Sequence, residues 1–522
     1  MKARPRKLLR VLGLLLALLM VAGTLAACSK TGNGGNTTGD LSGTSGEGSA
    51  GGETVPGTDP TTDPVTNEWG EDEVKHEIPK DVQFNNETLN IATRSAERWT
   101  REFVTDDLTD QVNKEIFYRN VAVESQLKIK IVLSKHSELT VANISNFTRW
   151  VLTSQMADTG EVDIVSGAAY FQTSSAIKDS VVNLHDPVMT YLDLSKVYWN
   201  QSYIDAASIY GGLYYVVGDM NLSLYDRTMV TFANYDTLVD LEYGDIFDIV
   251  TNYEWTYAKM LEIIKEYPYL EMDSVDGISA GDQISMISTA SSHAWDSWLG
   301  GFRLNLVQKA EDGGLEFNIL GNERISKGAS LVHELNRKSG NTYLVSNSPM
   351  ETFVGGNVLF MNFCLAEDPS DTALLRAFSD RYAILPVPMM DAEQKAYGAT
   401  TQDSTNIMSV LNCSSVNKAM VSAYLELTCS KSYDSVRPMY VKMMLTGRYL
   451  AIPENVTVLN LILDSVYFDS GVIYSVTLNN LEWLWRAEVS AGNDPTVVWS
   501  SRQGADQTAL DDLLTWYMTS GT

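Results

Sequence analysis

Strand and helix signals alternate along the folded part of the chain, and this alternation limits the fold more than any other feature. We expect these elements in order: a strand at Thr88–Ala92, a helix over 109–126, a strand at Lys128–Leu133, a helix over about 146–157 and a strand at Val162–Val165. Strands that alternate with helices are typical of βαβ units and a mostly parallel sheet. The pattern therefore predicts an α/β fold.

The same alternation returns in the second half of the chain. The pattern predicts a helix capped by Thr256, a helix over 326–337, strands at 381–386 and 406–411, and a helix over about 416–430. About 440 residues belong to this folded part, too many for one hydrophobic core. The sequence thus predicts two α/β lobes with the chain crossing between them.

The N-terminus has a basic start, an apolar run and an exit of small residues, which is typical of a secretory signal peptide over 1–27. Leu25–Cys28 resembles the bacterial lipobox, in which the cysteine is diacylated and the chain is cut before it. A spanning anchor is the alternative, but the run is short of the roughly 20 apolar residues needed. We therefore expect a lipid-anchored chain outside the cytoplasm, held to the bacterial membrane through Cys28.

Residues 28–82 are rich in Gly, Ser, Thr, Pro and acids. Such a segment buries too little apolar surface to offset the entropy of ordering, so it is expected to be a flexible linker. Three cysteines follow; Cys413 is expected to end a strand and Cys429 to end the helix after it, so the two are about a helix length apart, too far to bridge. We expect these two and Cys364 to be buried thiols.

The charge and the missing motifs exclude several classes of function. The net charge of −28 opposes binding to nucleic acid or anionic lipid. The sequence has no phosphate-binding loop, no G-x-S-x-G motif and no H-E-x-x-H motif. His333-Glu334 begins like the last of these motifs, but position 337, where the motif needs its second histidine, is Arg337. The five histidines are scattered, so no metal site is expected. No cofactor or catalytic residue is predicted, although a carboxylate pair brought together from distant loops stays possible.

An aromatic and polar stretch at 294–305 is the main candidate for ligand contact. Trp295 and Trp298 lie three residues apart around Asp296, so a helix would place both rings on one face. Flat rings stack on sugar faces, and carboxylates accept hydrogen bonds from sugar hydroxyls. The alternative is a pair of core tryptophans. Gly300–Gly301 favours the binding interpretation, because it suggests an abrupt turn with close backbone approach.

Two further segments carry similar chemistry. Trp199 and Asn200 lie in "YWNQ", where a single tryptophan is more often packing than platform. A strand is expected at Leu213–Val217, and Asp219 and Asn221 follow where it ends. Ligands of open α/β sheets bind at strand ends, so both polar side chains are candidates for contact.

Several segments together resemble extracellular solute-binding proteins of ABC importers, most closely the large carbohydrate-binding lipoproteins of Firmicutes. They are "VDIVSGAAY" (162–170), "GGLYYVVGDMNLSLYDRTMVTFAN" (211–234), "YEWTYAKMLEIIKE" (253–266), "FVGGNVLFMNF" (353–363) and "YAILPVPMMDAEQ" (382–394). Ala383 stands where the family usually has glycine. The likeness extends over about residues 85 to 485.

The resemblance implies a two-lobe clamp of the type II periplasmic-binding-protein kind, with hinge strands between the lobes. Crossings are implied near 219–222, 382 and 431–436. Lobe one is then 84–219 plus 384–431, and lobe two is 222–382 plus 436–522.

The resemblance also implies a receptor that binds a solute, expected to be a sugar or oligosaccharide, in a cleft between the lobes and delivers it to ABC permease subunits. The implied ligand-binding residues are Tyr170, Trp199, Asn200, Asp219, Asn221, Trp295, Asp296, Trp298, Asn362, Asp403 and Asp469. Two alternatives stay open: a secreted glycan-degrading lipoprotein, and a clamp-type sensor or adhesin for another polar solute.

Overall fold

The structure is a computed structural model that describes residues 75–139, 144–174, 179–275, 278–279, 281–445 and 452–519. The predicted signal peptide, Cys28 and the linker up to residue 74 lie outside these residues. The last part of the predicted linker is already folded, because Ile78 is only 5% exposed and belongs to the hydrophobic core. Within the described ranges, no helix is both long and apolar enough to cross a membrane.

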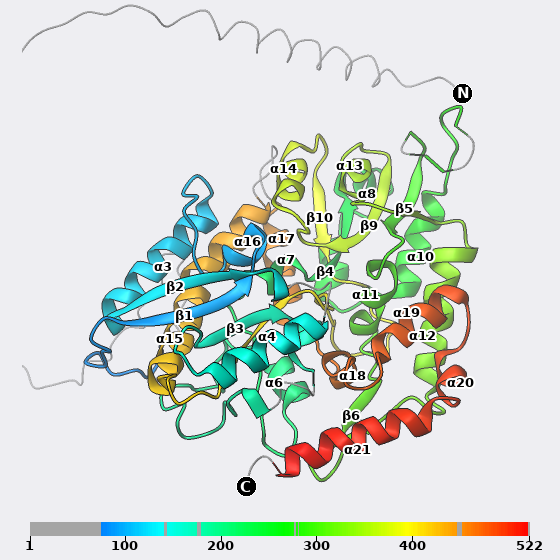
Figure 1. Cartoon of the computed structure of the whole chain (residues 1–522). Helices are drawn as coiled ribbons and strands as arrows, with labels where there is room; N and C mark the ends of the chain where they lie inside the picture. Colours follow the sequence, from blue (N-terminus) through cyan, green and yellow to red (C-terminus); the bar gives the residue numbers. More distant parts are fainter. Residues whose placement is uncertain are drawn as a thin grey trace, which may run out of the picture. The chain divides into compact units, whose positions relative to one another are not determined.

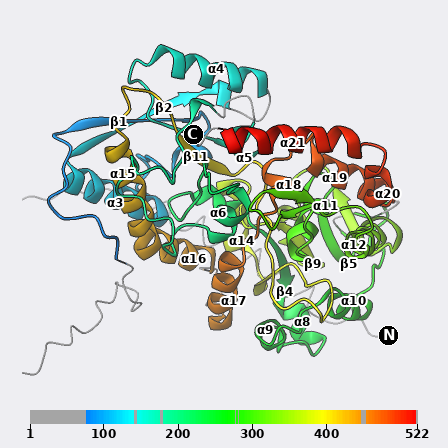
Figure 2. The same cartoon turned by 90° about the horizontal axis from the view of Figure 1, so that it is seen from below.

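The first sheet has the strand order β11-β3-β1-β2; β1, β2 and β3 are labelled in Figure 1. Its strands are β1 (Glu87–Arg94), β2 (Ile129–His136), β3 (Ile164–Ala168) and β11 (Asn406–Val410). β1 is parallel to both β2 and β3, whereas β11 is antiparallel to β3. Figure 2 shows helix α4 (Ile144–Ala157) on one side of this sheet, and α3 (Gln111–Leu127) and α15 (Lys418–Lys431) on the other.

The second sheet has the order β10-β4-β9-β5-β8. Its strands are β4 (Met229–Asn234), β5 (Ile284–Thr289), β8 (Thr342–Val345), β9 (Val358–Cys364) and β10 (Tyr382–Leu385). β5 is parallel to β8 and β9, while β4 is antiparallel to β9 and β10. Every residue of β4, β5 and β9 is buried, as expected for strands covered on both faces.

Helices and short elements complete the two lobes. The larger helices are α10 (Tyr257–Glu266), α11 (His293–Gly301), α12 (Glu323–His333), α14 (Pro369–Ala377), α16 (Arg437–Leu445), α17 (Pro453–Asp464), α19 (Leu481–Ala491) and α21 (Gln503–Thr519). The shorter ones are α2 (Glu97–Thr100), α5 (Ala169–Gln172), α6 (Gln201–Ala207), α7 (Leu222–Asp226), α8 (Tyr235–Asp240), α9 (Ile246–Thr251), α13 (Met350–Phe353), α18 (Ser470–Ile473) and α20 (Pro495–Trp499). A small hairpin pairs β6 (Val307–Lys309) with β7 (Leu315–Phe317), a 3-10 turn spans Ser137–Leu139, and π-helical turns span Glu334–Lys338 and Ser432–Val436.

The expected two-lobe α/β architecture is confirmed, but one crossing lies later than the resemblance implied. The chain first reaches the second sheet through α7, which precedes β4. It was expected to return near residue 382, yet Tyr382–Leu385 pairs with β4 as strand β10. The return to the first sheet is complete only at Asn406, where β11 begins beside β3.

Two local predictions are wrong. Residues 213–217 form no strand, because their backbone bonds mostly to loops; Val217 accepts from Asn200, and only Val216 bridges to β11, at Met408. Gly300 makes no turn, since α11 continues through Gly301. The predicted close approach at Gly300 is present, however, because its amide donates to Thr400 Oγ1 at 2.9 Å.

The three cysteines of the folded part are free and buried, as predicted. They are Cys364 in β9, Cys413 after β11 and Cys429 in α15. The fold is therefore stabilised by its apolar core and not by disulfides among the residues described.

Candidate functional site

The ends of several strands meet where the two lobes touch. In the first sheet, β1 and β3 end at the edge where β11 begins, because Asn406 pairs with Ala168. In the second sheet, β9 ends where β4 begins, since Met229 pairs with Cys364. The segments that leave these ends carry the polar and aromatic side chains described below, as expected for ligand sites of α/β sheets.

The centre of the candidate site is Arg486, which holds three carboxylates. Its Nε donates to Asp296 Oδ2 at 2.5 Å, and its Nη2 donates to Asp403 Oδ2 at 3.0 Å and to Glu482 Oε1 at 2.8 Å. Asp296 comes from α11, Asp403 from the segment before β11, and Glu482 from one turn earlier in α19. We call these four residues the Arg486 cluster. Helices α11 and α19 lie side by side in both views (Figures 1 and 2).

The Arg486 cluster places three carboxyl groups around one guanidinium, and burial disfavours the charged form of two of them. Burial raises the pKa of Asp296 to about 7, with nearby Arg486 opposing the shift and Asp403 adding to it. Burial also raises the pKa of Glu482 well above its usual range. Asp296 Oδ1 and Glu482 Oε2 have no hydrogen-bond partner among the residues described. Two buried acceptor atoms are therefore left for donors that the described part of the protein does not supply.

Two aromatic rings flank the Arg486 cluster, one from each lobe. Tyr170 in α5 and Trp483 in α19 have ring centroids 6.4 Å apart. The indole of Trp483 is 54% exposed, although it sits beside the Arg486 guanidinium, 5.6 Å from the ring centroid. Tyr170 donates from its hydroxyl to Asn480 Oδ1 at 3.0 Å. Ring faces next to carboxylate acceptors suit a solute with apolar faces and many hydroxyl groups.

Three of the sequence-predicted residues come together in this site: Tyr170, Asp296 and Asp403. The sequence reasoning missed Glu482, Trp483 and Arg486. A signal was available in α19, because Leu481, Leu484 and Trp485 have the i, i+3, i+4 spacing of a buried stripe and Trp483 is an aromatic residue outside it.

The two tryptophans of α11 are core residues, so the alternative considered for them holds. Trp298 is fully buried and packs against Tyr257 and Phe302, with ring centroids 6.1 and 5.2 Å away. Trp295 is 3% exposed and lies beneath Arg337, and its backbone carbonyl accepts from Trp485 Nε1. Neither ring offers a face to a solute.

The structure also places Trp199 and Asn200 in structural roles. Trp199 is 1% exposed and donates from Nε1 to Glu426 Oε2 at 3.1 Å. Asn200 caps α6, because its side chain accepts from the amide of Tyr203 at 2.8 Å. Trp199 Nε1 and Asn200 Oδ1 are therefore both hydrogen-bonded within the protein.

Asp219 and Asn221 are buried just before α7, where the chain crosses between the lobes. Asp219 accepts from the hydroxyl of Tyr225 and lies near Arg437, whereas Asn221 Oδ1 accepts from the amide of Gly218. Both side chains shape the crossing segment and do not reach the Arg486 cluster.

Asn362 and Asp469 lie apart from the Arg486 cluster as well. Asn362 is fully buried within β9. Asp469 caps α18 and accepts from the amides of Leu306 and Val307 at 3.0 and 3.2 Å. Both carboxyl oxygens of Asp469 therefore accept hydrogen bonds from backbone amides within the protein.

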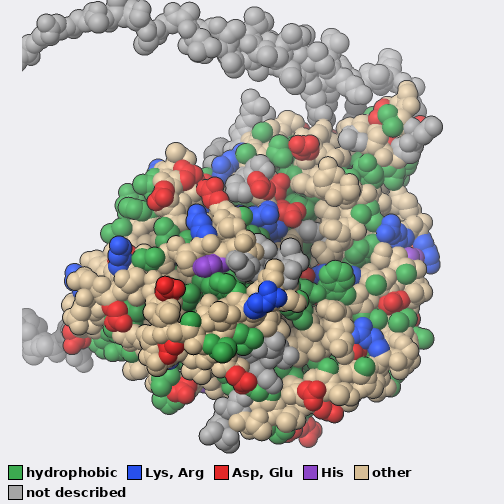
Figure 3. Space-filling view, viewed as in Figure 1, with side chains coloured by type: hydrophobic (Ala, Val, Ile, Leu, Met, Phe, Trp, Pro, Cys, Tyr) green, Lys and Arg blue, Asp and Glu red, His purple; other side chains and the backbone are tan. Residues whose placement is uncertain are grey.

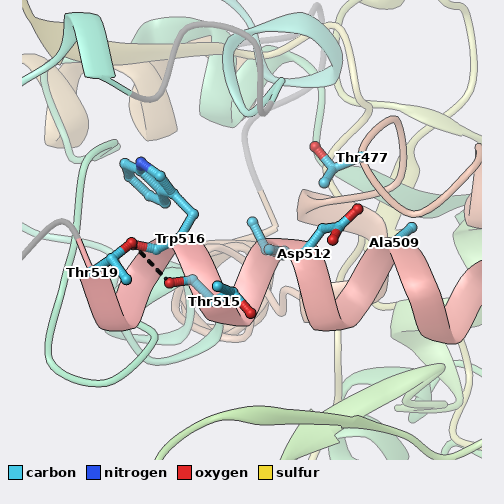
Figure 4. A pocket seen from close by; sticks show the side chains of 7 residues that line it. Thr477, Ala509, Asp512, Thr515, Trp516 and Thr519 are labelled. Atoms are coloured by element: carbon cyan, nitrogen blue, oxygen red, sulfur yellow. Dashed lines mark hydrogen bonds between the residues drawn. The ribbon is translucent and has the colours of Figure 1, made fainter.

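A groove beside α21 is a separate feature. It has a volume of about 500 Å³ and is lined by Thr477, Ala509, Asp512, Leu513, Thr515, Trp516 and Thr519 (Figure 4). None of the sequence-predicted ligand residues lines it. On the face shown in Figure 3, basic side chains lie among acidic ones between the lobes, whereas the chain as a whole is strongly acidic.

The chain matches no family model and no curated protein sequence. Solved structures with a similar fold include the GacH receptor of Streptomyces glaucescens, solved unliganded and with acarbose, at 12% identity and TM-score 0.48 over 82% of this chain and 99% of that one. UgpB of Mycobacterium tuberculosis with glycerophosphocholine has 12% identity and TM-score 0.49 over 81% and 98%. The ABC transporter associated binding protein of B. animalis subsp. lactis Bl-04 with beta-1,6-galactobiose has 15% identity and TM-score 0.44 over 83% and 98%.

Proposed function

We propose that this chain is the extracytoplasmic solute receptor of an ABC importer and that it binds a carbohydrate where its lobes meet. The observation that carries the proposal is the Arg486 cluster flanked by Tyr170 and Trp483. It combines ring faces with buried carboxylate oxygens that lack described donors, and its parts come from both lobes. Sugar hydroxyls are donors of the required kind.

In this proposal the protein binds without turnover. A solute that contacts Tyr170 on one lobe and Trp483 on the other is bound fully only when the lobes are closed, so it shifts the population toward the closed state. The closed receptor then delivers the solute to permease subunits. Lipid on Cys28 anchors the protein to the membrane, and the predicted linker acts as a tether up to the point near Ile78 where the chain joins the core.

The proposed lobes follow the predicted boundaries with one change. Lobe one comprises 84–219 and 406–431, and lobe two comprises 222–399 and 436–522, because residues 386–399 contact the second lobe, for example through Trp255 and Thr256. The second crossing becomes 400–405, the segment that contains Asp403.

The proposal is tested by thermal unfolding of the whole chain, purified in detergent, against neutral and anionic mono- and oligosaccharides. A solute at 100 times its Kd is expected to add about 2.7 kcal/mol of stability. One class of saccharide should raise the midpoint and be recovered intact. If no saccharide raises it, the carbohydrate assignment fails.

One observation favours an enzyme as the second candidate. A buried acid with a raised pKa beside other carboxylates is the arrangement that glycoside hydrolases use, and Asp296 is such an acid. Recovery of a shortened glycan from the same incubation, lost in Asp296→Asn, would replace the receptor by a hydrolase.

A further inference from the structure

Three arginines surround one tryptophan at the boundary between the lobes. The guanidinium carbon of Arg94 lies 3.4 Å from the ring centroid of Trp99, that of Arg227 4.9 Å and that of Arg98 5.2 Å. Arg94 ends β1, Arg98 and Trp99 belong to α2, and Arg227 follows α7. We call these four residues the Trp99 cluster.

Arg94 is a buried cation without a counter-charge in contact. Its side chain is 1% exposed, and its hydrogen bonds go to neutral acceptors, the Asn406 side chain and the Ser404 carbonyl. Nη1 has no hydrogen-bond partner, and no ion pair reaches Arg94, among the residues described. A guanidinium keeps its charge in proteins, so such burial is costly until an anion is present.

The nearest acid does not fill this role. Glu102 accepts from Asn406 Nδ2 at 2.6 Å and from the amide of Ser223 at 3.0 Å, so the Asn406 amide stands between Glu102 and Arg94. Burial lowers the pKa of Arg94, Glu102 opposes that shift, and Arg227 and Arg98 add to it. Asp403 also opposes the shift, so burial is the main reason that the charged form of Arg94 is disfavoured.

A three-residue segment joins the Trp99 cluster to the Arg486 cluster. Gln402 Oε1 accepts from Arg227, Asp403 Oδ2 accepts from Arg486, and the Ser404 carbonyl accepts from Arg94. Each of three consecutive residues therefore contacts a different arginine. A solute that lies along residues 402–404 would reach both clusters.

The outer side of the Trp99 cluster is closed by Glu367, which follows β9 in the second lobe. Its carbonyl accepts from Arg227 at 2.9 Å and from Arg98 at 3.4 Å, and its carboxylate lies 3.3 Å from Arg227. The Glu367 side chain is 38% exposed, so the arginines are separated from solvent here by one displaceable carboxylate. When the lobes are open, an oxyanion of the solute would take the place of the Glu367 carboxylate beside Arg227.

We propose that the solute carries an anionic group, a phosphate or a carboxylate, and that Arg94, Arg98 and Arg227 bind it beside Trp99. This inference rests on the proposed function, and it narrows the solute to an anionic saccharide whose hydroxyls face the Arg486 cluster. Arginine binds oxyanions through charge-assisted hydrogen bonds of fixed geometry. The chain's net charge of −28 does not prevent this, because exposed charges are screened beyond about 10 Å whereas the arginines act in direct contact.

The test is isothermal titration of the full chain in detergent at constant ionic strength, with glucose against glucose 6-phosphate, galactose against galacturonate, and inorganic phosphate alone. We expect an anionic sugar to bind roughly tenfold or more tightly than its neutral partner, and Arg98→Gln and Arg227→Gln to remove that advantage. Arg98 is the first choice because it is half-buried and its loss leaves the Arg94 hydrogen bonds intact.

Arg381→Gln is the matched control. Arg381 also stacks on an aromatic ring, with Tyr235 at 4.9 Å, and pairs with Asp236 at 2.7 Å, but it precedes β10 at the end of the sheet away from the site. Arg381→Gln should change the affinity for each sugar by no more than about twofold, which is a smaller change than the loss of one charge-assisted hydrogen bond would cause. Circular dichroism and the unfolding midpoint report whether each variant is folded.

The outcomes separate this inference from the proposed function. The anion subsite is overturned if neutral sugars bind as tightly as anionic ones, or if both variants keep the preference for anionic sugars. Either result is still consistent with the proposed receptor function. Phosphate binding that depends on Arg98, without binding of any saccharide, supports the subsite and overturns the carbohydrate assignment. If neither phosphate nor any saccharide binds, both proposals fail.

Discussion

Arg486 and Asp403 are 3.0 Å apart, and this contact joins helix α19 of one lobe to the segment through which the chain returns to the other. The same guanidinium also holds Asp296 and Glu482. One side chain thus balances three carboxylates at the place where the lobes meet, and its contribution can be measured.

Replacement of Arg486 by Gln should destabilise the protein by about 3 kcal/mol or more, because it leaves buried carboxylates without their counter-charge. The side chain is only 15% exposed, so solvent screening reduces the effect little. Urea unfolding at pH 8 measures the loss. Arg324→Gln is the control; its guanidinium is 41% exposed and pairs with Asp391, so a change below about 1 kcal/mol is expected. Equal losses in the two variants would contradict the central role of Arg486.

Replacement of Trp483 by Ala should weaken saccharide binding roughly tenfold or more while changing the stability of the free protein little. The ring is 54% exposed, so few core contacts are lost. Tyr118→Ala is the matched control, since this ring on α3 is 63% exposed and lies away from the site. Titration calorimetry with the saccharide found in the thermal screen compares the three proteins, and unchanged affinity in Trp483→Ala would exclude stacking on this ring.

The buried carboxyl of Asp469 should make stability fall as pH rises. Burial raises its pKa to about 7, against bonds from the amides of Gly471, Leu306 and Val307 that lower it. The ordinary value is about 3.9, so the folded state binds the proton more tightly and stability is lost as pH rises from about 4 to 7. Between pH 5 and 8, the free energy of unfolding of the wild type, measured in urea, should fall by about 2 to 3 kcal/mol more than that of Asp469→Asn.

Asp158 provides the control of opposite sign. Hydrogen bonds from the side chains of Ser414 and Ser415 hold its pKa well below the ordinary range. Its contribution is therefore complete above pH 5 and is lost only in acid. From pH 5 to 8, the free energy of unfolding of Asp158→Asn should change with pH just as that of the wild type does. If Asp469→Asn also followed the wild type, the pH dependence would not come from Asp469.

Gly300→Ala should destabilise the protein by about 1 to 3 kcal/mol through overpacking. A Cβ at this position would lie 2.3 Å from Thr400 Oγ1 and 2.8 Å from the Thr400 amide nitrogen, and backbone cannot move aside cheaply. Gly504→Ala in α21 is the matched helical control, since nothing lies within 4 Å of its added Cβ. Gly504→Ala should raise the free energy of unfolding by about 0.5 to 1 kcal/mol. Unfolding midpoints show whether each variant is less or more stable than the wild type.

Local sequence determined the elements that depend on local physics. The helix capped by Thr256 and the alternating strand around Ile131 were predictable, because a capping side chain and a polar–apolar period act within a few residues. That Cys413 and Cys429 do not pair followed in the same way, because a helix of nearly its full length separates Cys413, after β11, from Cys429 near the end of α15. The α/β class followed from the order of these elements.

Tertiary structure alone decided which polar and aromatic residues are available to a solute. Trp298 and Trp483 have the same chemistry, yet the first packs against Phe302 in the core and the second stays exposed beside Arg486. Arg94 and Asn406 touch although 312 positions separate them. Such contacts form because β11 is inserted antiparallel beside β3, a long-range pairing that leaves no local trace in the sequence.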